Sequence, residues 1–230
     1  MNLQELGLKY GTDKAVHGIA TITANRPSNI SYCEIYEKHF SKNRLNVERV
    51  LEIGTLTGAS ARMWKEYFPN AEIHVVDINP YTKSYEEDRI TIHIGDQNDE
   101  LFLMDLAQKL GPLDIVIDDG SHITEHQIRS FKFLYPNLKD NGFYVIEDLL
   151  NSYEEALHPD VRSAWPGMHL NKESDPLKNF RVDFDRFIND QIRSLDQRLN
   201  EKLFSIHFYY QILMIENYNE WHLKKSTKFL

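Results

Sequence analysis

The stretch that decides the fold is LEIGTLTGAS, residues 51–60. Its apolar start is typical of a buried strand, and its two glycines indicate a turn that opens a helix. Such a turn lets the backbone approach a ligand closely, and the helix N-terminus favours a carboxylate. The spacing is G-x-x-x-G and lacks the G-x-G-x-x-G of dinucleotide-binding folds, so NAD and FAD are disfavoured. By itself the pattern also fits a plain tight turn.

Around this stretch, short β-rich runs alternate with amphipathic segments from residue 47 to residue 148. The runs are VERVLEIG, EIHVVD, ITIHIGD, LDIVIDDG and GFYVIED. This alternation predicts a parallel sheet covered by helices on both faces. Several of the strands end in an acidic residue or in glycine. Because ligands bind outside the carboxyl ends of such strands, we expect the functional site there.

The segments on either side of this core have a different sequence pattern. Residues 1–46 contain GTDK at 11–14 and a helix over 31–40, which we interpret as a helical cap. Residues 151–202 combine a proline-interrupted loop region with a helix whose apolar residues share one face. Residues 203–218 contain LFSIHFY and QILMIENY around a turn near Tyr210 and Gln211, which indicates a closing hairpin. The sequence therefore predicts one α/β domain over 1–230, with a mostly parallel seven-stranded sheet, a core at 47–150 and an antiparallel C-terminal hairpin.

Composition narrows the class of protein. The 230 residues are 41% hydrophobic and 27% charged, which is typical of a globular protein. A net charge of −9 argues against nucleic acid as a partner, since binding to phosphate depends on Lys and Arg. We expect a cytoplasmic protein, because no run is long enough to span a membrane and the start does not resemble a signal peptide. Cys33, the one cysteine, agrees with a reducing compartment and is interpreted as a buried thiol.

Polar residues at two strand ends suggest a nucleoside-binding site. Asp77 ends the strand that follows the glycine turn, where a carboxylate can accept hydrogen bonds from both ribose hydroxyls. Asp96 and Gln97 close the next strand, where a polar pair could meet an adenine amino group. The alternative for Asp96 is a capping role at the helix that begins near Asn98.

Carboxylates follow the next two predicted strands. Asp118 and Asp119 end one of them, and Glu147 and Asp148 end the other. If these strands are neighbours, the carboxylates converge and repel one another unless a cation lies among them. With oxygen ligands we expect Mg²⁺, with Mn²⁺ or Ca²⁺ as alternatives. The competing interpretation gives Asp119 a helix-capping role and makes Glu147 and Asp148 solvated turn residues.

His122 is the candidate general base. It lies three residues after Asp119, and an imidazole has a pKa suited to taking a proton from a hydroxyl near neutral pH. The alternative is a solvated histidine at a helix start. His126, one helical turn later, is a weaker candidate.

These motifs resemble class I methyltransferases that depend on S-adenosylmethionine (SAM), and in particular the metal-dependent sugar O-methyltransferases of macrolide biosynthesis, the mycinamicin and macrocin type. The similarity covers roughly residues 6–153, and IDDGSH with IED is its most specific part. The resemblance implies a Rossmann-like class I methyltransferase fold in which residues 47–150 bind SAM and metal. Mg²⁺ would be held by Asp119, Glu147 and Asp148, with His122 and Asp119 as catalytic residues. The residues expected to bind SAM are Glu52, Gly54, Thr55, Gly58, Ser60, Asp77, Asp96, Gln97 and Asp118.

The implied acceptor is a small molecule or glycan with vicinal hydroxyls. The sequence does not name it, because residues 151–176, on the expected substrate side, match no known pattern. Alternatives are a catechol-type O-methyltransferase acting on a phenolic diol, a SAM-binding or nucleotide-binding protein without turnover, and a nicotinamide oxidoreductase. The aromatic residues of the first helix and the long helix near residues 180–199 fit a homo-oligomer interface or core packing equally well.

Overall fold

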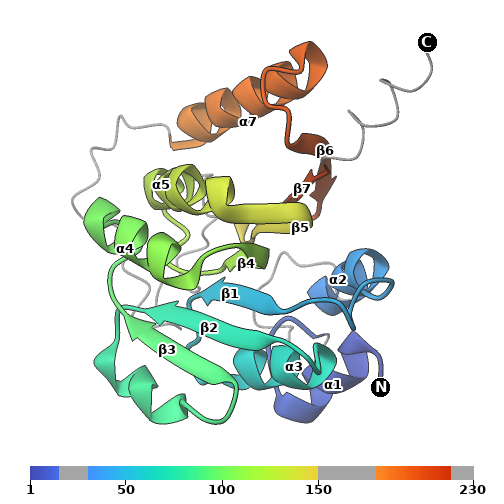
Figure 1. The fold of residues 1–230 in the computed structure, drawn as a ribbon, viewed down its shortest axis with the longest axis vertical. Coiled ribbons are helices and arrows are strands. Elements are labelled where there is room, and N and C mark those ends of the chain that lie inside the picture. Colours follow the sequence, from blue (N-terminus) through green and yellow to red (C-terminus); the bar gives the residue numbers. More distant parts are fainter. Residues whose placement is uncertain (16–30, 150–179, 219–230) are drawn as a thin grey trace, which may run out of the picture.

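The computed structural model describes residues 1–15, 31–149 and 180–218, and these form a seven-stranded sheet with helices on both faces (Figure 1). The strands are β1 (Arg49–Ile53), β2 (Glu72–Asp77), β3 (Ile90–Ile94), β4 (Leu113–Asp118), β5 (Leu138–Ile146), β6 (Leu203–Tyr209) and β7 (Ile212–Asn217). Their order in the sheet is β3-β2-β1-β4-β5-β7-β6. The first five strands of this order run parallel, and β7 and β6 close the edge as antiparallel strands. The predicted α/β fold is thereby confirmed.

Six α-helices and two short 3₁₀ helices are present in the described residues. They are α1 (Leu3–Tyr10), α2 (Tyr32–Phe40), α3 (Ala59–Tyr67), α4 (Glu100–Leu110), α5 (Thr124–Leu134), α7 (Phe180–Gln197), η2 (Pro80–Tyr85) and η3 (Tyr135–Asn137). Helices α1, α2 and α3 cover one face of the sheet, and α4, α5 and α7 cover the other (Figure 1). None of these helices is both long and apolar enough to cross a lipid bilayer.

Alternating side chains of the strands build two separate hydrophobic cores. In β1, Val50 packs with Trp64 and Phe40 on the side of α2 and α3. The next residue, Leu51, packs with Leu103 and Phe131 on the side of α4 and α5. Because both faces of the sheet are buried, the strands are apolar on both sides, as is usual for parallel sheets.

The strand order reverses between β1 and β4. From β1 the chain proceeds outward through β2 and β3, and it then returns to place β4 on the other side of β1. The loops that leave β1 and β4 therefore diverge from adjacent points, since Ile53 pairs with Asp118 at the strand ends. This reversal point is where parallel α/β sheets bind their ligands.

The cap and the C-terminal hairpin have local causes in the sequence. Asn2 and Glu5 form a reciprocal capping box at the start of α1, and Gly11 ends that helix in a left-handed conformation. The turn between β6 and β7 falls at the predicted position, with Gln211 at φ 61°. The boundaries proposed for the cap and the helical insertion remain predictions, because residues 16–30 and 150–179 lie outside the described part.

The apolar stripe predicted for the long helix is only partly buried. Phe184, Phe187 and Ile188 pack in the core formed with α5. Ile192 is 40% exposed and Leu199 is 68% exposed, so the second half of the stripe does not lie in the core of this chain. The helix packs against α5 and β6 at one end of the sheet (Figure 1).

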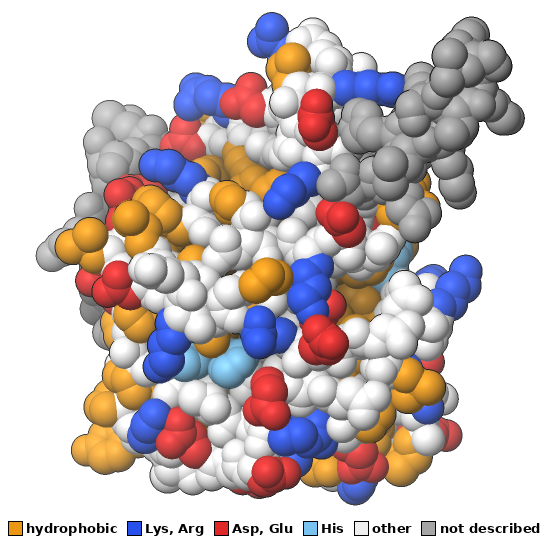
Figure 2. All heavy atoms as spheres, viewed as in Figure 1, with side chains coloured by type: hydrophobic (Ala, Val, Ile, Leu, Met, Phe, Trp, Pro, Cys, Tyr) orange, Lys and Arg blue, Asp and Glu red, His pale blue; other side chains and the backbone are white. Residues whose placement is uncertain are grey.

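The molecular face seen in Figure 2 carries a mixture of charges. Lys and Arg side chains lie among Asp and Glu side chains on that face and do not form a continuous basic surface. Ion pairs in the described residues include Lys139 with Glu48 at 2.7 Å and Lys65 with Glu87 at 3.0 Å.

Candidate active site

The glycine turn after β1 lies against the loop that follows β4. Gly54 has φ 87°, and a Cβ atom added there would lie 2.3 Å from the backbone oxygen of Asp119. The conformation and the close approach each require glycine. Gly58, at φ 72°, precedes α3, and an added Cβ would lie 3.0 Å from the Tyr85 side chain. The two loops that leave the reversal point are thus in direct backbone contact.

Glu52 is a buried carboxylate beneath this turn. It accepts hydrogen bonds from Ser60 Oγ at 2.7 Å and from Trp64 Nε1 at 3.1 Å, both from α3. Burial raises the pKa of Glu52 to about 7, and nearby Lys14 and the two hydrogen-bond donors offset this rise only in part. The structure gives Ser60 the task of orienting Glu52, while the contacts with SAM expected of both residues remain predictions.

Asp77 and Thr55 lie at adjacent strand ends, at the reversal point where parallel α/β sheets have their ligand crevice. Asp77 is half-buried at the end of β2, and its Oδ2 accepts a hydrogen bond from the Thr55 backbone N–H at 3.1 Å. The Thr55 hydroxyl is buried and has no hydrogen-bond partner in the described residues. A buried hydroxyl without a partner is a place where a ligand can supply the missing hydrogen bond.

Asp96 and Gln97 lie in different environments. Asp96 is exposed and accepts from the Asn98 backbone N–H at 2.8 Å, whereas Asp99 is the residue that caps α4. Gln97 is buried, and its amide bridges two neighbours. Its Nε2 donates to Asp118 at 3.2 Å, and its Oε1 accepts from the Ser121 backbone N–H at 2.6 Å.

Asp118 is fully buried, and burial raises its pKa to about 6, although the hydrogen bond from Gln97 lowers it. The Gln97 bridge fixes the loop after β4 to the end of β3. The expected contact of Gln97 with adenine and the expected role of Asp118 in binding SAM are not tested by this geometry.

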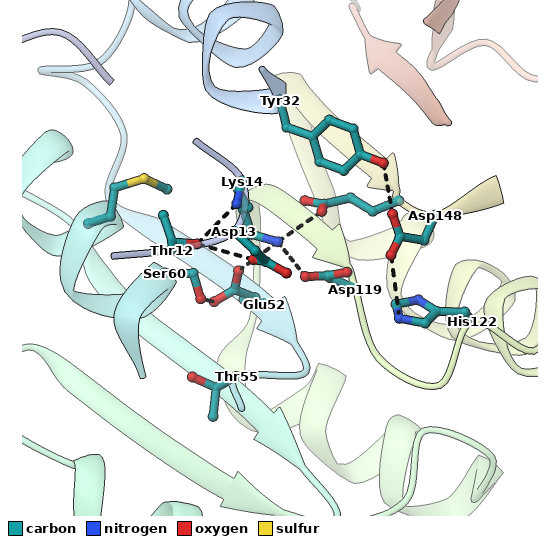
Figure 3. A network of polar contacts seen from close by, with 12 residues as sticks. Thr12, Asp13, Lys14, Tyr32, Glu52, Thr55, Ser60, Asp119, His122 and Asp148 are labelled. Carbon is teal, nitrogen blue, oxygen red and sulfur yellow. Dashed lines mark hydrogen bonds and ion pairs between the residues drawn. The ribbon is translucent and has the colours of Figure 1, made fainter. Parts of the chain in front are cut away.

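The acidic residues after β4 and β5 converge, because these strands are neighbours in the sheet. Asp119, His122 and Asp148 form a group in which one possible metal-ligating atom of each residue lies within 4.8 Å of the others. Figure 3 shows Asp148 between His122 and the hydroxyl of Tyr32. An ion placed in this group would have two carboxylates and one imidazole around it.

Glu147 is not a member of that group. Its Oε2 accepts from Lys14 Nζ at 2.9 Å, and its Oε1 accepts from the Tyr36 hydroxyl. Both carboxylate oxygens thus have protein partners, and burial raises the pKa of Glu147 well above its usual value. Glu147 as a metal ligand remains a prediction that would require these contacts to rearrange.

Lys14 is the unexpected member of the site. Its side chain is 2% exposed, and its ammonium group contacts Asp119 and Glu147 and lies 3.7 Å from Glu52 (Figure 3). Burial alone would lower the pKa of Lys14, but the three carboxylates outweigh that effect and hold the pKa well above its usual value. The lysine therefore carries its positive charge inside the protein.

Two tyrosines of α2 complete the surroundings of the carboxylates. Tyr32 donates a hydrogen bond to Asp148 Oδ1 at 2.7 Å, and Tyr36 donates to Glu147. Both belong to the aromatic residues of the helix predicted over 31–40. Their separation of four residues places both hydroxyls on the same side of α2, toward the end of β5.

His122 has a constrained backbone and a nitrogen without a partner. Its φ of 57° is uncommon for a residue other than glycine. Its Nε2 lies 3.7 Å from Asp148 Oδ2, and its buried Nδ1 has no hydrogen-bond partner among the described residues. A carboxylate on one side of the ring and an unpartnered nitrogen on the other suit a residue that accepts a proton.

Comparison with known proteins agrees with this geometry. Residues 51–149 match a family model described as a methyltransferase domain. The chain is 44% identical over 151 residues to demethylmacrocin O-methyltransferase of Streptomyces fradiae, covering 63% of this chain and 35% of that protein. It is 42% identical over 149 residues to mycinamicin VI 2''-O-methyltransferase of Micromonospora griseorubida, covering 61% and 34%. The chain thus spans about a third of the length of the curated relatives that it matches.

A solved structure extends the similarity over nearly the whole chain. The MycE methyltransferase of the mycinamycin biosynthetic pathway, in complex with Mg and SAH, superposes with a TM-score of 0.73 at 30% identity. The match covers 95% of this chain and 55% of MycE. The fold is that of class I SAM-dependent methyltransferases, and residues 51–149 match a methyltransferase domain. Within that class, the chain is similar to the sugar O-methyltransferases of the mycinamicin type, as its motifs suggested.

Proposed function

We propose that this protein transfers the methyl group of SAM to a sugar hydroxyl in a reaction that depends on a divalent metal, Mg²⁺ in the first instance. The observation that carries the proposal is the contact between the turn at Gly54 and the loop at Asp119. This contact puts the crevice at Glu52 and Thr55 beside the carboxylate group. A methyl donor in the crevice and a hydroxyl at the carboxylates would then be neighbours, as direct transfer requires.

The residues present fit a divalent cation. Asp119, Asp148 and, as predicted, Glu147 would hold it, because Mg²⁺ prefers oxygen ligands. The buried carboxylates repel one another, and burial raises the pKa of Asp119 despite the opposing charge of Lys14. A bound Mg²⁺ acts as a Lewis acid that lowers the pKa of a coordinated hydroxyl.

The residues around the crevice fit SAM. In this proposal the unpartnered Thr55 hydroxyl and the close-packed backbone at Gly54 meet its amino-acid part, and half-buried Asp77 accepts from its ribose. Gly58 and Ser60 begin the helix that follows the turn. Asp96, Gln97 and Asp118 complete the proposed cofactor side.

His122 acts as the general base in this proposal. Asp148 lies beside Nε2 and orients the ring, and the proton of the acceptor hydroxyl passes to a ring nitrogen of His122. The hydroxyl oxygen then forms a bond to the methyl carbon as the bond from that carbon to the SAM sulfur breaks. S-adenosylhomocysteine and the methyl ether are the products.

The acceptor is proposed to be a sugar with vicinal hydroxyls, on a glycosylated small molecule or a glycan. This part rests on the relatives, which are named for methylation of macrolides and of rhamnosyl tetracenomycin. Since the chain spans about a third of their length, the acceptor is the part of the proposal that most needs direct assay.

The test is calorimetric titration with SAM and with Mg²⁺, each in the presence and absence of the other, followed by turnover assays on rhamnosyl glycosides and on catechol. We expect SAM to bind wild type and His122→Ala alike, while His122→Ala loses about 10²- to 10⁴-fold in turnover. The metal affinity of His122→Ala should stay unchanged if the residue is a base and fall if it is a ligand. We expect Asp119→Ala to lose the metal site. Absence of SAM binding to wild type would overturn the proposal, and turnover of catechol alone would replace the sugar with a phenolic diol.

A further inference from the structure

We propose that Lys14 is a built-in counter-ion that keeps the carboxylates of the site assembled when no metal is bound and that moderates their affinity for metal. Its ammonium group contacts Asp119 and Glu147 and lies 3.7 Å from Glu52. These carboxylates come from the ends of β4, β5 and β1, which are the three adjacent strands at the middle of the sheet. One cation is therefore shared by the proposed cofactor side and the proposed metal side.

The position of Lys14 is fixed by the backbone on both sides. Gly11 ends α1 in the left-handed conformation, and the Thr12 N–H donates to Gly7 O at 3.1 Å. The Lys14 carbonyl accepts from the Cys33 N–H at 3.2 Å and from Ser31 Oγ at 3.2 Å, at the start of α2. Lys14 thus belongs to a backbone segment that is hydrogen-bonded to α1 and to the start of α2. The position of this segment, and not a long side chain extending from the surface, puts the ammonium group inside the protein.

A counter-ion is needed because several negative groups are buried together. The side chains of Glu52 and Glu147 are 0% and 2% exposed, and Asp119 is 21% exposed. Carboxylates removed from water repel one another strongly, and breaking a buried ion pair by removing one partner leaves the other charge uncompensated. The Lys14 ammonium donates a hydrogen bond to Asp119 Oδ2, so Asp119 Oδ1 remains available to a second cation. This carboxylate cluster is therefore stable without a metal ion and can still bind one.

The counter-ion role predicts an effect of charge that packing alone would not give. In the absence of metal and SAM, Lys14→Met should lower the melting temperature by about 10 °C, the scale expected for a broken buried pair in a protein of this size. The matched control is Lys9→Met, which removes an ion pair with Glu66 at the surface and should shift melting by only about 2 °C. The double variant Lys14→Met with Glu147→Gln should melt higher than Lys14→Met, because it removes one of the uncompensated negative charges.

Metal supplies the second readout. Saturating Mn²⁺ should raise the melting temperature of Lys14→Met by more than that of wild type, because the ion replaces the missing charge and no longer meets a neighbouring ammonium. This arm rests on the proposed function, whereas the metal-free melts do not. A wild type that binds no Mn²⁺ would therefore count against the function, and the melts would still decide the role of Lys14. The counter-ion role is overturned if Lys14→Met melts at the same temperature as the Lys9→Met control. It is also overturned if adding Glu147→Gln to Lys14→Met raises neither the melting temperature nor the yield of soluble protein.

Discussion

Replacing Tyr32 with Phe tests whether the N-terminal cap orients the metal site. The change removes one hydroxyl that donates to Asp148 Oδ1 at 2.7 Å from a side chain that is 3% exposed. A hydrogen bond to a charged group contributes about 1.5–3 kcal/mol. Since about 1.4 kcal/mol corresponds to tenfold in affinity, the loss should be roughly 10- to 100-fold, which is also typical for groups that orient metal ligands. The physical reason is that, without the Tyr32 hydroxyl, the Asp148 side chain is no longer held in one orientation. Part of the binding free energy of the ion is then used to fix that orientation.

The assay is calorimetric titration with Mn²⁺, together with a thermal melt of each protein. Tyr209→Phe is the matched control, because its hydroxyl bonds to His39 Nε2 at 2.7 Å, and His39 belongs to the same helix as Tyr32. We expect the control to bind Mn²⁺ like wild type. If Tyr32→Phe folds normally and its Mn²⁺ affinity stays within about twofold of wild type, the orienting role of Tyr32 is wrong.

Two further changes probe the backbone and the pH response. Gly54→Ala should destabilise the protein far more than Gly11→Ala and should abolish metal binding. Both glycines are left-handed, at a cost of about 1–2 kcal/mol for alanine, but the new Cβ meets the Asp119 backbone oxygen at 2.3 Å in one case and open space in the other. Equal melting temperatures of Gly54→Ala and Gly11→Ala would contradict the close approach at Gly54. Burial lowers the pKa of His74 and His93 to about 4. The folded state then binds fewer protons than the unfolded state between about pH 6.5 and 4, so these histidines favour folding at neutral pH and that contribution is lost on acidification. The drop in melting temperature from pH 7 to pH 5 should be smaller in His93→Gln than in wild type, and an equal drop would count against the assignment.

The fold could be predicted from the sequence because its signals are local. Alternation of β-rich and amphipathic runs identifies the strands, and acidic or glycine ends mark the edge where the site lies. The hairpin was predicted at Tyr210 and Gln211, and the turn is found there. The exposure of Ile192 and Leu199 could not be predicted, because helical periodicity shows which face is apolar and not how far the neighbouring helix extends.

The partners of the carboxylates were missed for a related reason. Lys14 lies in the GTDK motif that the sequence analysis singled out, but its contact with Glu147 spans 133 residues and has no local signal. Tyr32 and Tyr36 have the spacing of a buried apolar face, and spacing does not show that their hydroxyls need acceptors. The available signal was electrostatic, because converging buried carboxylates require a cation, and the lysine of GTDK is a basic residue that can supply it.

The contacts around Asp148 come from both the N-terminal and the C-terminal parts of the chain, and this affects when they form during folding. The Tyr32 hydroxyl, which donates to Asp148, lies 116 residues upstream of it in the sequence. The same hydroxyl lies 3.4 Å from the side-chain oxygen of Gln211, which follows β6. The Leu149 N–H also donates to the Gln211 carbonyl at 3.2 Å. During synthesis the N-terminal part emerges first, so the sheet from β1 to β5 can begin to fold before Gln211 leaves the ribosome. Contacts at such sequence separations close slowly. We therefore expect the contacts around Asp148 to be completed when the C-terminal hairpin docks. Mn²⁺ binding followed in time after refolding would report that step separately from the earlier appearance of helix and sheet.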